Sequence, residues 1–309
     1  MPDALDLTLS LVDWHAAFGL PAHADPQALP SEDNPYGIAY AAARRLGFIP
    51  ADAACVARAW QSQSERTGHF DPRAWPADPA DFGIPPGPSP LAFAPCPKAL
   101  GLYAILPSAD WVGRLARAGV PTLQLRCKSG DAAAVRAEIQ AAVAAVKGTD
   151  SLLFINDHWR EAIAAGAYGV HLGQEDLGTL SAADVSEIRD AGLRLGLSTH
   201  GYAEMLRADA LGPSYLALGA VYPTTLKAMP TPPQGVPRLR AYARLLRDRS
   251  LVAIGGIGAE QVPEIAQVGV GSFAVVRAIT GAEQPEDAVK SLRQAWAQRT
   301  QRLPWDAGR

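Results

Sequence analysis

The sequence is poor in cysteine, and this shortage excludes two classes of protein. Only three cysteines occur in 309 residues, Cys55, Cys96 and Cys127, and no two of them stand in a C-x-x-C spacing. Three scattered thiols cannot form a disulfide framework, and without paired cysteines a structural zinc site is not expected. The composition therefore predicts a chain that works in a reducing compartment, the cytoplasm.

Long apolar runs and an excess of charge are also lacking. No segment approaches the roughly 18 apolar residues of a membrane span, and the N-terminal stretch MPDALDLTLSLVDWHAAF carries acids and no basic start, so we expect no signal peptide. The formal net charge is −3, which argues against a nucleic-acid or membrane partner. With 48% hydrophobic and 19% charged residues, the chain is expected to be globular.

Proline is not spread evenly along the chain and crowds one segment. Nine of the 26 prolines lie between Pro72 and Pro97. Proline removes a backbone donor and disfavours helix in the residue before it. We therefore predict that residues 69–98 form an extended connector or strap.

The residues before this connector predict a small helical module, residues 1–68, with no evident chemistry. Alanine-rich patterns with apolar residues at helical spacing mark its elements. The predicted helices are Tyr36–Leu46 and Ala51–Ser62, with a shorter one at Leu9–Phe18.

After Leu100 short apolar runs alternate with helical patterns, which predicts an α/β fold. About eight strand–helix units in about 200 residues indicate a (β/α)8 TIM barrel over residues 99–300, with a small helical N-terminal extension. An open doubly wound sheet is the alternative, but the first strand lacks a G-x-G-x-x-G after it. The predicted strands are Leu102–Leu106, Thr122–Leu125, Leu152–Ile155, Gly169–Leu172, Leu195–Leu197, Tyr215–Leu218, Leu251–Ile254 and Ser272–Val276. The predicted helices are Ala132–Val146, His158–Ala165, Ala182–Asp190, Ala203–Leu211, Val236–Leu246, Glu260–Val268 and Pro285–Gln298.

Basic residues gather where the second predicted strand ends. In QLRCK, the side chains of Gln124, Arg126 and Lys128 point one way and that of Cys127 points the other. Cations aimed into a barrel mouth are costly unless they meet an anion. Structural ion pairs with nearby aspartates are the alternative, but Lys227 adds a third cation and favours an anionic ligand.

Two carboxylates follow neighbouring strands. Asp157 ends the motif FIND and Asp176 lies in HLGQED, so their side chains can approach each other. An oxygen pair of this kind suits Mg²⁺, which also accepts phosphate oxygens. The alternative for Asp157 is a helix cap. The two aspartates and the cations together predict a diphosphate site.

A second anion site is predicted on the other side of the mouth. Gly255 and Gly256 follow the seventh strand, and their backbone N–H groups can face a ligand. Phosphate sites near strands seven and eight recur in this fold, although a glycine pair is often only a tight turn.

From about Leu100 to Ile279 the sequence resembles the thiamine phosphate synthase family. The motifs that carry the resemblance are QLRCK, FIND, VHLGQEDL, GLSTH, LGAVYPTTLKAMPTPPQG, AIGGIG and VGSFAVVRAIT, in the family's order. The resemblance implies a transferase that joins 4-amino-2-methyl-5-hydroxymethylpyrimidine diphosphate to thiazole phosphate. Pyrophosphate is released and thiamine phosphate is formed.

The resemblance also implies residue roles. Asp157 and Asp176 would hold Mg²⁺ on the diphosphate, Gln124 would lie beside the pyrimidine, and Ser198 would lie by its ring or amino group. The diphosphate would be bound by Arg126, Lys128, Asn156 and Lys227, and the thiazole phosphate by Thr224 and the backbone at Gly256, Val276 and Arg277. The residues expected to act in catalysis are Arg126, Lys128, Ser198 and Lys227.

The chemistry implied by the resemblance is dissociative, with pyrophosphate leaving before the thiazole nitrogen attacks. It needs no protein nucleophile, so His171 and His200 are interpreted as structural or supporting residues. The sequence departs from the family at Leu226, which replaces a threonine, and at Arg277, which stands where serine is usual. Both changes bear on substrate affinity more than on reaction type.

Two other functions stay open. A thiazole tautomerase shares this fold and a similar histidine motif, but its reaction needs no diphosphate or Mg²⁺. A non-catalytic protein that binds thiamine precursors is the second alternative. The N-terminal helices faintly resemble the last helices of a pyrimidine kinase, yet the kinase's glycine loop and aspartate are not evident, and we favour a cap that packs on the barrel. A homo-oligomer is compatible with the sequence.

Overall fold

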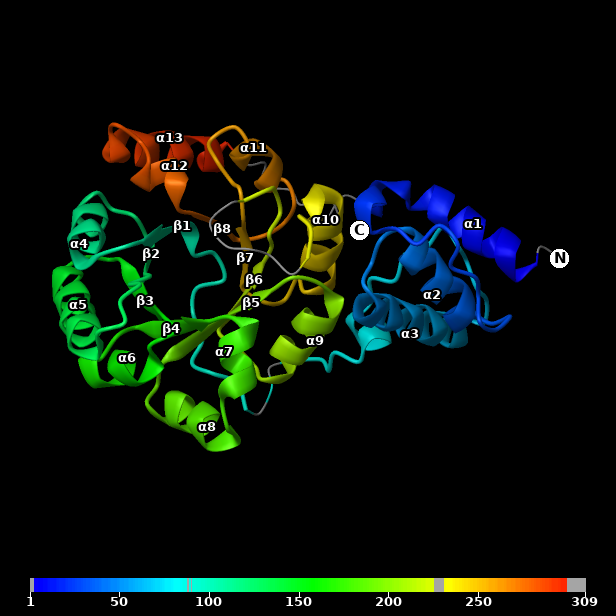
Figure 1. Cartoon of the computed structure of the whole chain (residues 1–309), viewed down its shortest axis with the longest axis horizontal. Helices are drawn as coiled ribbons and strands as arrows, with labels where there is room; N and C mark the ends of the chain where they lie inside the picture. Colours follow the sequence, from blue (N-terminus) through cyan, green and yellow to red (C-terminus); the bar gives the residue numbers. More distant parts are fainter. Residues whose placement is uncertain (1–2, 88, 90, 225–230, 299–309) are drawn as a thin grey trace.

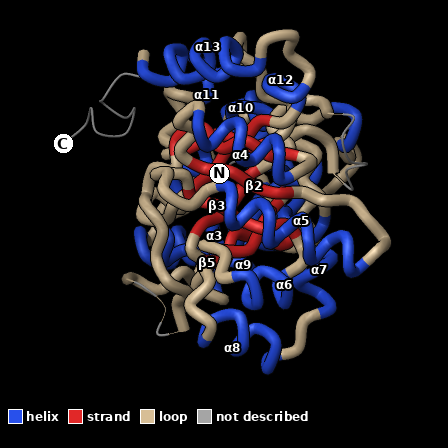
Figure 2. Tube along the Cα trace, turned by 90° about the vertical axis from the view of Figure 1, so that its left-hand side faces the viewer, coloured by secondary structure: helices blue, strands red, loops and turns tan. Residues whose placement is uncertain are grey.

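Eight parallel strands close into a barrel in strict chain order, from β1 next to β2 round to β8 next to β1. The structure is a computed structural model and describes residues 3–87, 89, 91–224 and 231–298. Figures 1 and 2 show the strands at the centre with helices around them. The predicted TIM barrel is confirmed. The strands are β1 Gly101–Leu106, β2 Thr122–Leu125, β3 Leu152–Asn156, β4 Gly169–Leu172, β5 Arg194–Thr199, β6 Tyr215–Leu218, β7 Leu251–Ile254 and β8 Ser272–Val275.

The helices after each strand cover the outside of the barrel. They are α4 Ala109–Arg117, α5 Ala132–Ala145, α6 Trp159–Ala165, α7 Gln174–Thr179, α8 Ala182–Asp190, α9 Tyr202–Ala210, α10 Gly235–Leu245, α11 Val262–Ile265, α12 Arg277–Thr280 and α13 Pro285–Ala297. Within the described ranges, no helix is long and apolar enough to cross a membrane.

The predicted helices of the barrel differ from the observed ones at α4, α7, α11 and α12, and the short α12 was not predicted. Helix α4 was not predicted, although Ser108 accepts a hydrogen bond from the Trp111 N–H and caps it. Helix α7 begins within the motif HLGQED, at Gln174, where no helix is predicted. The helix predicted at Glu260–Val268 shortens to α11 because its first residues form turns after β7.

Alternate side chains of each strand face two different cores. The inward residues form a small cluster that includes Tyr103, Phe154, Tyr215 and Val252, whereas the outward ones pack under the helices. Large rings fit inside because small residues face them. A Cβ on Gly196 would lie 2.1 Å from the Tyr215 ring, so glycine at this position makes room for the tyrosine.

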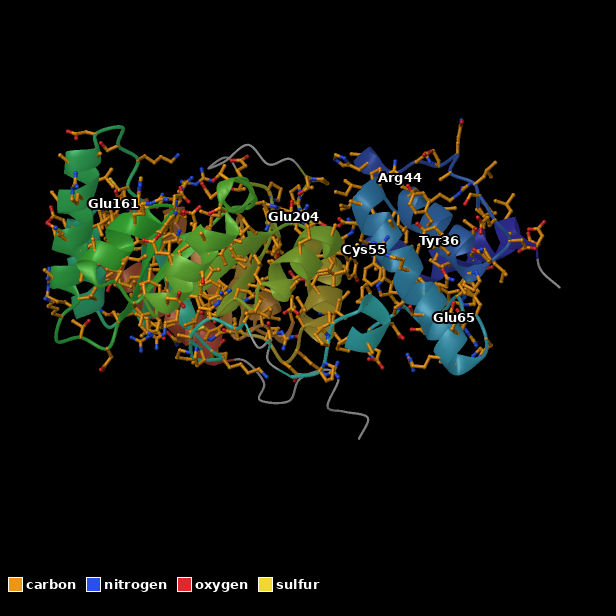
Figure 3. All side chains as sticks on the ribbon, turned by 90° about the horizontal axis from the view of Figure 1, so that it is seen from below. Tyr36, Arg44, Cys55, Glu65, Glu161 and Glu204 are labelled. Carbon is orange, nitrogen blue, oxygen red and sulfur yellow. The ribbon has the colours of Figure 1, made fainter. Side chains whose placement is uncertain are left out.

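Three helices before the barrel pack together at one side of it, beyond α9 and α10 (Figure 1). They are α1 Ala4–Trp14, α2 Pro35–Arg45 and α3 Pro50–Thr67. The helix predicted at Leu9–Phe18 starts earlier, because Asp3 caps it, and ends at Trp14 before a short 3-10 turn. In Figure 3, Cys55 of α3 lies nearer to the barrel than Tyr36 or Glu65.

Arg238 of α10 joins the helical module to the barrel. It is only 3% exposed, and its guanidinium donates to the carbonyls of Phe18 and Leu46 at 2.9 Å each. Its guanidinium carbon also lies 3.6 Å from the centre of the Phe48 ring. The buried charge is therefore satisfied by backbone oxygens and an aromatic face.

The proline-rich segment wraps the barrel as a strap at the end where the strands begin. The Phe93 N–H donates to the Gly212 carbonyl at 2.8 Å, just before β6. The Cys96 thiol contacts the Ser214 carbonyl at 3.0 Å, and Ser250 donates to the Pro97 carbonyl at 3.1 Å. The strap thus holds the side of the barrel opposite to the strands' carboxyl ends.

Candidate functional site

The first part of the candidate site follows β2. Gln124 is buried inside the barrel, Arg126 is half-buried and Lys128 is exposed. Cys127 packs against the outer core, under the helices. The alternation predicted for QLRCK is therefore observed for Gln124 and Cys127. Among the described residues, neither Arg126 nor Lys128 forms an ion pair within 4.0 Å, although the charge of Arg126 acts on Asp157 and opposes the rise of its pKa.

The carboxylates of Asp157 and Asp176 face each other across the ends of β3 and β4. The pKa of Asp157 is raised to about 6, first by loss of hydration and then by the negative charge of Asp176. Asp157 also has a φ of 64°, a left-handed conformation that is rare outside glycine. A strained backbone and a repelling carboxylate are features that proteins concentrate at functional sites.

Asp157 does not serve as a helix cap. The N-cap residue of α6 is His158, and no side chain caps this helix. Asp176 does make one local bond, because its carboxylate accepts the Gly173 N–H at 3.0 Å. In the described part of the chain, no group of three or more His, Cys, Asp or Glu side chains is placed to hold a metal ion.

A chain of hydrogen bonds runs across the barrel interior beneath the mouth. Gln124 donates from Nε2 to Asn156 Oδ1 at 2.7 Å and accepts at Oε1 from the Tyr103 hydroxyl at 3.0 Å. The hydroxyls of Tyr103 and Tyr215 are 2.8 Å apart. The chain connects β2 and β3 with β1 and β6.

The same chain continues to β4 and β5. Nδ1 of His171 lies 2.6 Å from the Tyr215 hydroxyl, and its Nε2 lies 2.8 Å from Ser198 Oγ. Burial lowers the pKa of His171 to about 4, so the ring is neutral near pH 7. The predicted site residues Asn156, Gln124 and Ser198 are thus connected through three residues whose linkage the sequence did not reveal.

The other histidine has a local partner. His200, directly after β5, bonds to Glu204 through Nδ1 at 2.6 Å. Loss of hydration is the largest single influence on the pKa of Glu204 and would raise it. The hydrogen bonds and the charge of His200 together outweigh this influence, so the pKa of Glu204 is lowered. Gln174 secures the neighbouring backbone by donating to the Ser198 carbonyl at 2.7 Å.

The second predicted anion site lies where β6, β7 and β8 end. Gly255 and Gly256 have φ values of 101° and 67°, and a Cβ on Gly256 would come within 2.6 Å of the Pro223 carbonyl oxygen. The glycines therefore let the segment that carries Thr224 lie directly against the end of β7. Val276 is the N-cap of α12, and Arg277 begins this helix. Lys227 and Leu226 lie outside the described residues.

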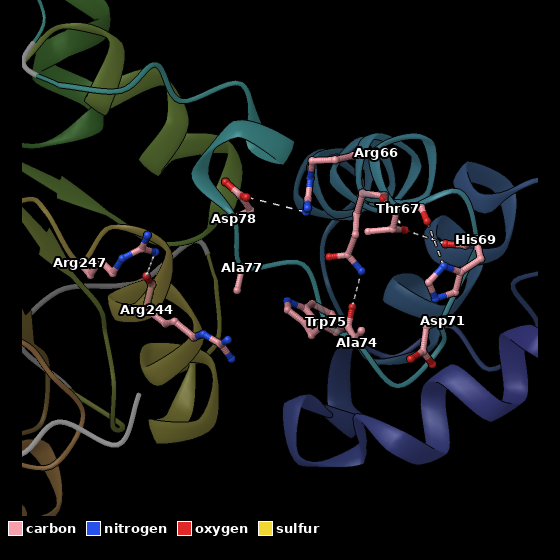
Figure 4. Close-up of a pocket in the computed structure, with 11 residues that line it drawn as sticks. Arg66, Thr67, His69, Asp71, Ala74, Trp75, Ala77, Asp78, Arg244 and Arg247 are labelled. Atoms are coloured by element: carbon pink, nitrogen blue, oxygen red, sulfur yellow. Dashed lines mark hydrogen bonds and ion pairs between the residues drawn. The ribbon is translucent and has the colours of Figure 1, made fainter. Parts of the chain in front are cut away.

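A hollow of about 530 Å³ lies elsewhere, between the helical module, the strap and the end of α10 (Figure 4). Arg66 on its wall is paired with Asp81 at 2.6 Å and with Asp78 at 3.8 Å. The rim residues Arg244 and Arg247 lie at the end of α10 remote from the strands' carboxyl ends. The hollow is therefore separate from the barrel mouth.

A closed parallel barrel, with two carboxylates facing each other at its mouth and two cations, Arg126 and Lys128, that form no ion pair in the part of the chain that the structure describes, defines a TIM-barrel protein. The thiamine monophosphate synthase family model matches residues 102–279. This chain belongs to that family. The sequence-based assignment to an enzyme of thiamine phosphate synthesis is confirmed.

Comparison with individual proteins supports the same family. The thiamine-phosphate synthase of Neisseria meningitidis serogroup B is 51% identical over 206 residues, which cover 67% of this chain and 99% of that protein. The thiamine-phosphate synthase of Photorhabdus laumondii is 50% identical, covering 67% of this chain and 91% of that protein. The solved thiamine phosphate pyrophosphorylase from Pyrococcus furiosus is 28% identical, with a TM-score of 0.56, covering 64% of this chain and 96% of that one.

Proposed function

We propose that the barrel mouth joins 4-amino-2-methyl-5-hydroxymethylpyrimidine diphosphate to thiazole phosphate and releases pyrophosphate. The observation that carries the proposal is the joint presence of unpaired cations after β2 and facing carboxylates after β3 and β4. A leaving diphosphate needs both kinds of group, because its charge grows as the bond to carbon breaks.

The carboxylate pair is suited to hold Mg²⁺. Loss of hydration and the charge of Asp176 raise the pKa of Asp157, and a divalent cation held by the two carboxylates would relieve the repulsion. Two protein oxygens leave several coordination positions for diphosphate oxygens. When bound, Mg²⁺ would neutralise the charge of the leaving pyrophosphate.

The remaining residues would bind and orient the substrates. In this proposal Arg126 and Lys128, with Lys227 from outside the described residues, contact the diphosphate, and Asn156 donates to it. Gln124 and Ser198 contact the pyrimidine. The thiazole phosphate lies against Thr224 and the backbone of Gly256, Val276 and Arg277. Arg126, Lys128, Lys227 and Ser198 act in catalysis by charge neutralisation and positioning, and no protein nucleophile takes part.

The proposal also covers the cellular location, the binding partners and the domain division of the protein. All three cysteines are free thiols, which supports a cytoplasmic location. The partners proposed are the two small-molecule substrates, without nucleic acid or membrane, and a homo-oligomer is compatible with the barrel. We also propose the division into a helical module (1–68), a connector (69–98) and a barrel (99–300).

An assay with both substrates and Mg²⁺ tests the proposal against its alternatives. We expect pyrophosphate and thiamine phosphate to form in equal amounts, and neither to form without the thiazole phosphate over the same period. Aromatisation of a thiazole carboxylate without pyrophosphate release would indicate a tautomerase instead. Tight binding of both substrates without turnover would indicate a binding protein.

A further inference from the structure

The buried hydrogen-bond chain below the mouth has only two self-consistent directions. Each tyrosine hydroxyl carries one proton, and so does a neutral imidazole. Tyr103 and Tyr215 are each 1% exposed and His171 is 7% exposed, so bulk water does not offer these groups other partners. The direction of one bond therefore fixes the direction of all the others.

Starting from Gln124, the direction can be followed bond by bond. Tyr103 donates to Gln124 Oε1 at 3.0 Å, so its oxygen must accept from Tyr215. The Tyr215 proton is then committed, and its oxygen must accept from Nδ1–H of His171. The neutral ring is left with a lone pair on Nε2, which accepts the hydroxyl proton of Ser198.

The two ends of the chain consequently present opposite polarity to the mouth. At one end the Ser198 hydroxyl donates its hydrogen bond to His171 Nε2, so toward the mouth its oxygen offers only lone pairs. At the other end Gln124 keeps one free N–H of its amide, and Asn156, whose Oδ1 is occupied by Gln124, offers its Nδ2 donors. Reversal of both amides would turn the Asn156 carbonyl toward the diphosphate, which charge repulsion disfavours.

We infer that Tyr103, Tyr215 and His171 are positioning residues that fix Ser198 as an acceptor and so select a 4-aminopyrimidine over a 4-oxopyrimidine. The inference rests on the proposed function, since it concerns the same pyrimidine. An exocyclic amino group donates to the Ser198 oxygen. An oxo group at the same place brings two lone pairs together and leaves both without a proton.

The tautomer of His171 gives the first test, and it requires no turnover. We would record the side-chain ¹⁵N spectrum of the substrate-free protein at pH 7.5, assigning His171 by its loss in His171→Asn. The inference predicts the Nδ1–H tautomer, with Nε2 as acceptor. Observation of Nε2–H, or of a charged ring, would overturn it whether or not the protein is active.

Substrate selectivity gives the second test. The diphosphates of the 4-amino and 4-oxo pyrimidines are compared by kcat/KM with thiazole phosphate, or by calorimetric binding if turnover is absent. A polar site of this kind rejects the mismatched analogue by about 10⁴-fold. We expect Tyr215→Phe, which interrupts the chain, to lower this selectivity at least about tenfold, because Ser198 becomes free to donate.

Tyr202→Phe is the matched control, because it also removes a buried hydroxyl, one that accepts from Trp75 at 3.0 Å and lies outside the chain. Its selectivity should equal that of the unaltered enzyme. Unchanged selectivity in Tyr215→Phe would overturn the inference. If Tyr215→Phe does not fold, the ¹⁵N spectrum of the unaltered protein still decides.

Discussion

His171 shows how a buried side chain links the stability of the barrel to pH. It lies at 2.6 Å from Tyr215 and 2.8 Å from Ser198, and burial lowers its pKa from 6.5 to about 4. A protonated ring would lose its acceptor nitrogen and carry a charge in a buried site with little access to water. In the folded enzyme, the side chain of His171 is therefore neutral near pH 7.

This lowered pKa predicts a loss of stability in mild acid. Between pH 6.5 and about 4 the unfolded chain takes up a proton at His171 that the folded chain refuses. The free energy of unfolding therefore carries the full contribution of the neutral His171 above pH 6.5. It falls as the pH drops toward 4, by about 3 kcal/mol in total. Urea unfolding at pH 7.5 and 5.0 measures it. In His171→Asn the change with pH should be smaller, and an identical change in both proteins would contradict the assignment.

Helix α9 depends on a residue from outside the barrel. Its N-cap, Gly201, has no side chain to bond the helix N–H groups, and Asp52 of α3 supplies a carboxylate that accepts the Ala203 N–H at 2.8 Å. A Cβ on Gly201 would lie 2.1 Å from Asp52 Oδ2, so the glycine admits the partner. The helical module thereby supports the turn that follows Ser198.

Asp52→Ala is expected to loosen the start of α9. Loss of a capping carboxylate costs about 1 kcal/mol, and the freed Ala203 N–H should exchange faster with solvent. Hydrogen exchange resolved by residue measures the effect. Asp131→Ala is the control, since it removes the side-chain cap of α5 and should accelerate exchange there while leaving α9 unchanged. Equal protection of α9 in Asp52→Ala and the unaltered chain would refute the role.

The strands could be predicted from the sequence, but the buried chain of hydrogen bonds could not. Parallel strands are buried on both faces, so Thr122–Leu125 and Tyr215–Leu218 stand out as short apolar runs. The polar residues at strand ends followed from the fold itself. Tyr103 and Tyr215 gave no such signal, because a tyrosine in a strand usually packs as an apolar ring. Only barrel closure brings them together across 112 positions of sequence.

Contacts between the N-terminal module and the barrel were equally out of reach. The sequence predicted that the N-terminal module packs on the barrel, but it did not indicate which barrel residue contacts the module. Arg238 could not be singled out, because its position is also that of an ordinary exposed arginine on an amphipathic helix. Its two backbone acceptors lie 220 and 192 positions away. The module, the strap and the barrel share one outer core, and we therefore expect them to unfold together.

Arg238→Ala should separate this unfolding into two steps. It leaves the Phe18 carbonyl without its donor, takes from the Leu46 carbonyl one of two donors, the other being the Leu20 N–H, and removes the cation from Phe48. We expect a loss of about 3 kcal/mol. Calorimetry should show one transition in the unaltered chain and an earlier transition of the module in the variant. Arg240→Ala, on an exposed position of the same helix, should keep one transition. A single transition at an unchanged temperature in Arg238→Ala would contradict the proposal that Arg238 couples the unfolding of the module to that of the barrel.

The facing carboxylates are tested most directly by the rate of pyrophosphate release in Asp176→Ala, assayed with both substrates and Mg²⁺. Asp190→Ala removes an exposed carboxylate from neighbouring α8 and is the control. We predict that Asp176→Ala loses about a hundredfold or more of kcat/KM while its circular dichroism and melting temperature stay close to those of Asp190→Ala. Near-normal turnover in Asp176→Ala would contradict the assignment of this mouth as the diphosphate site.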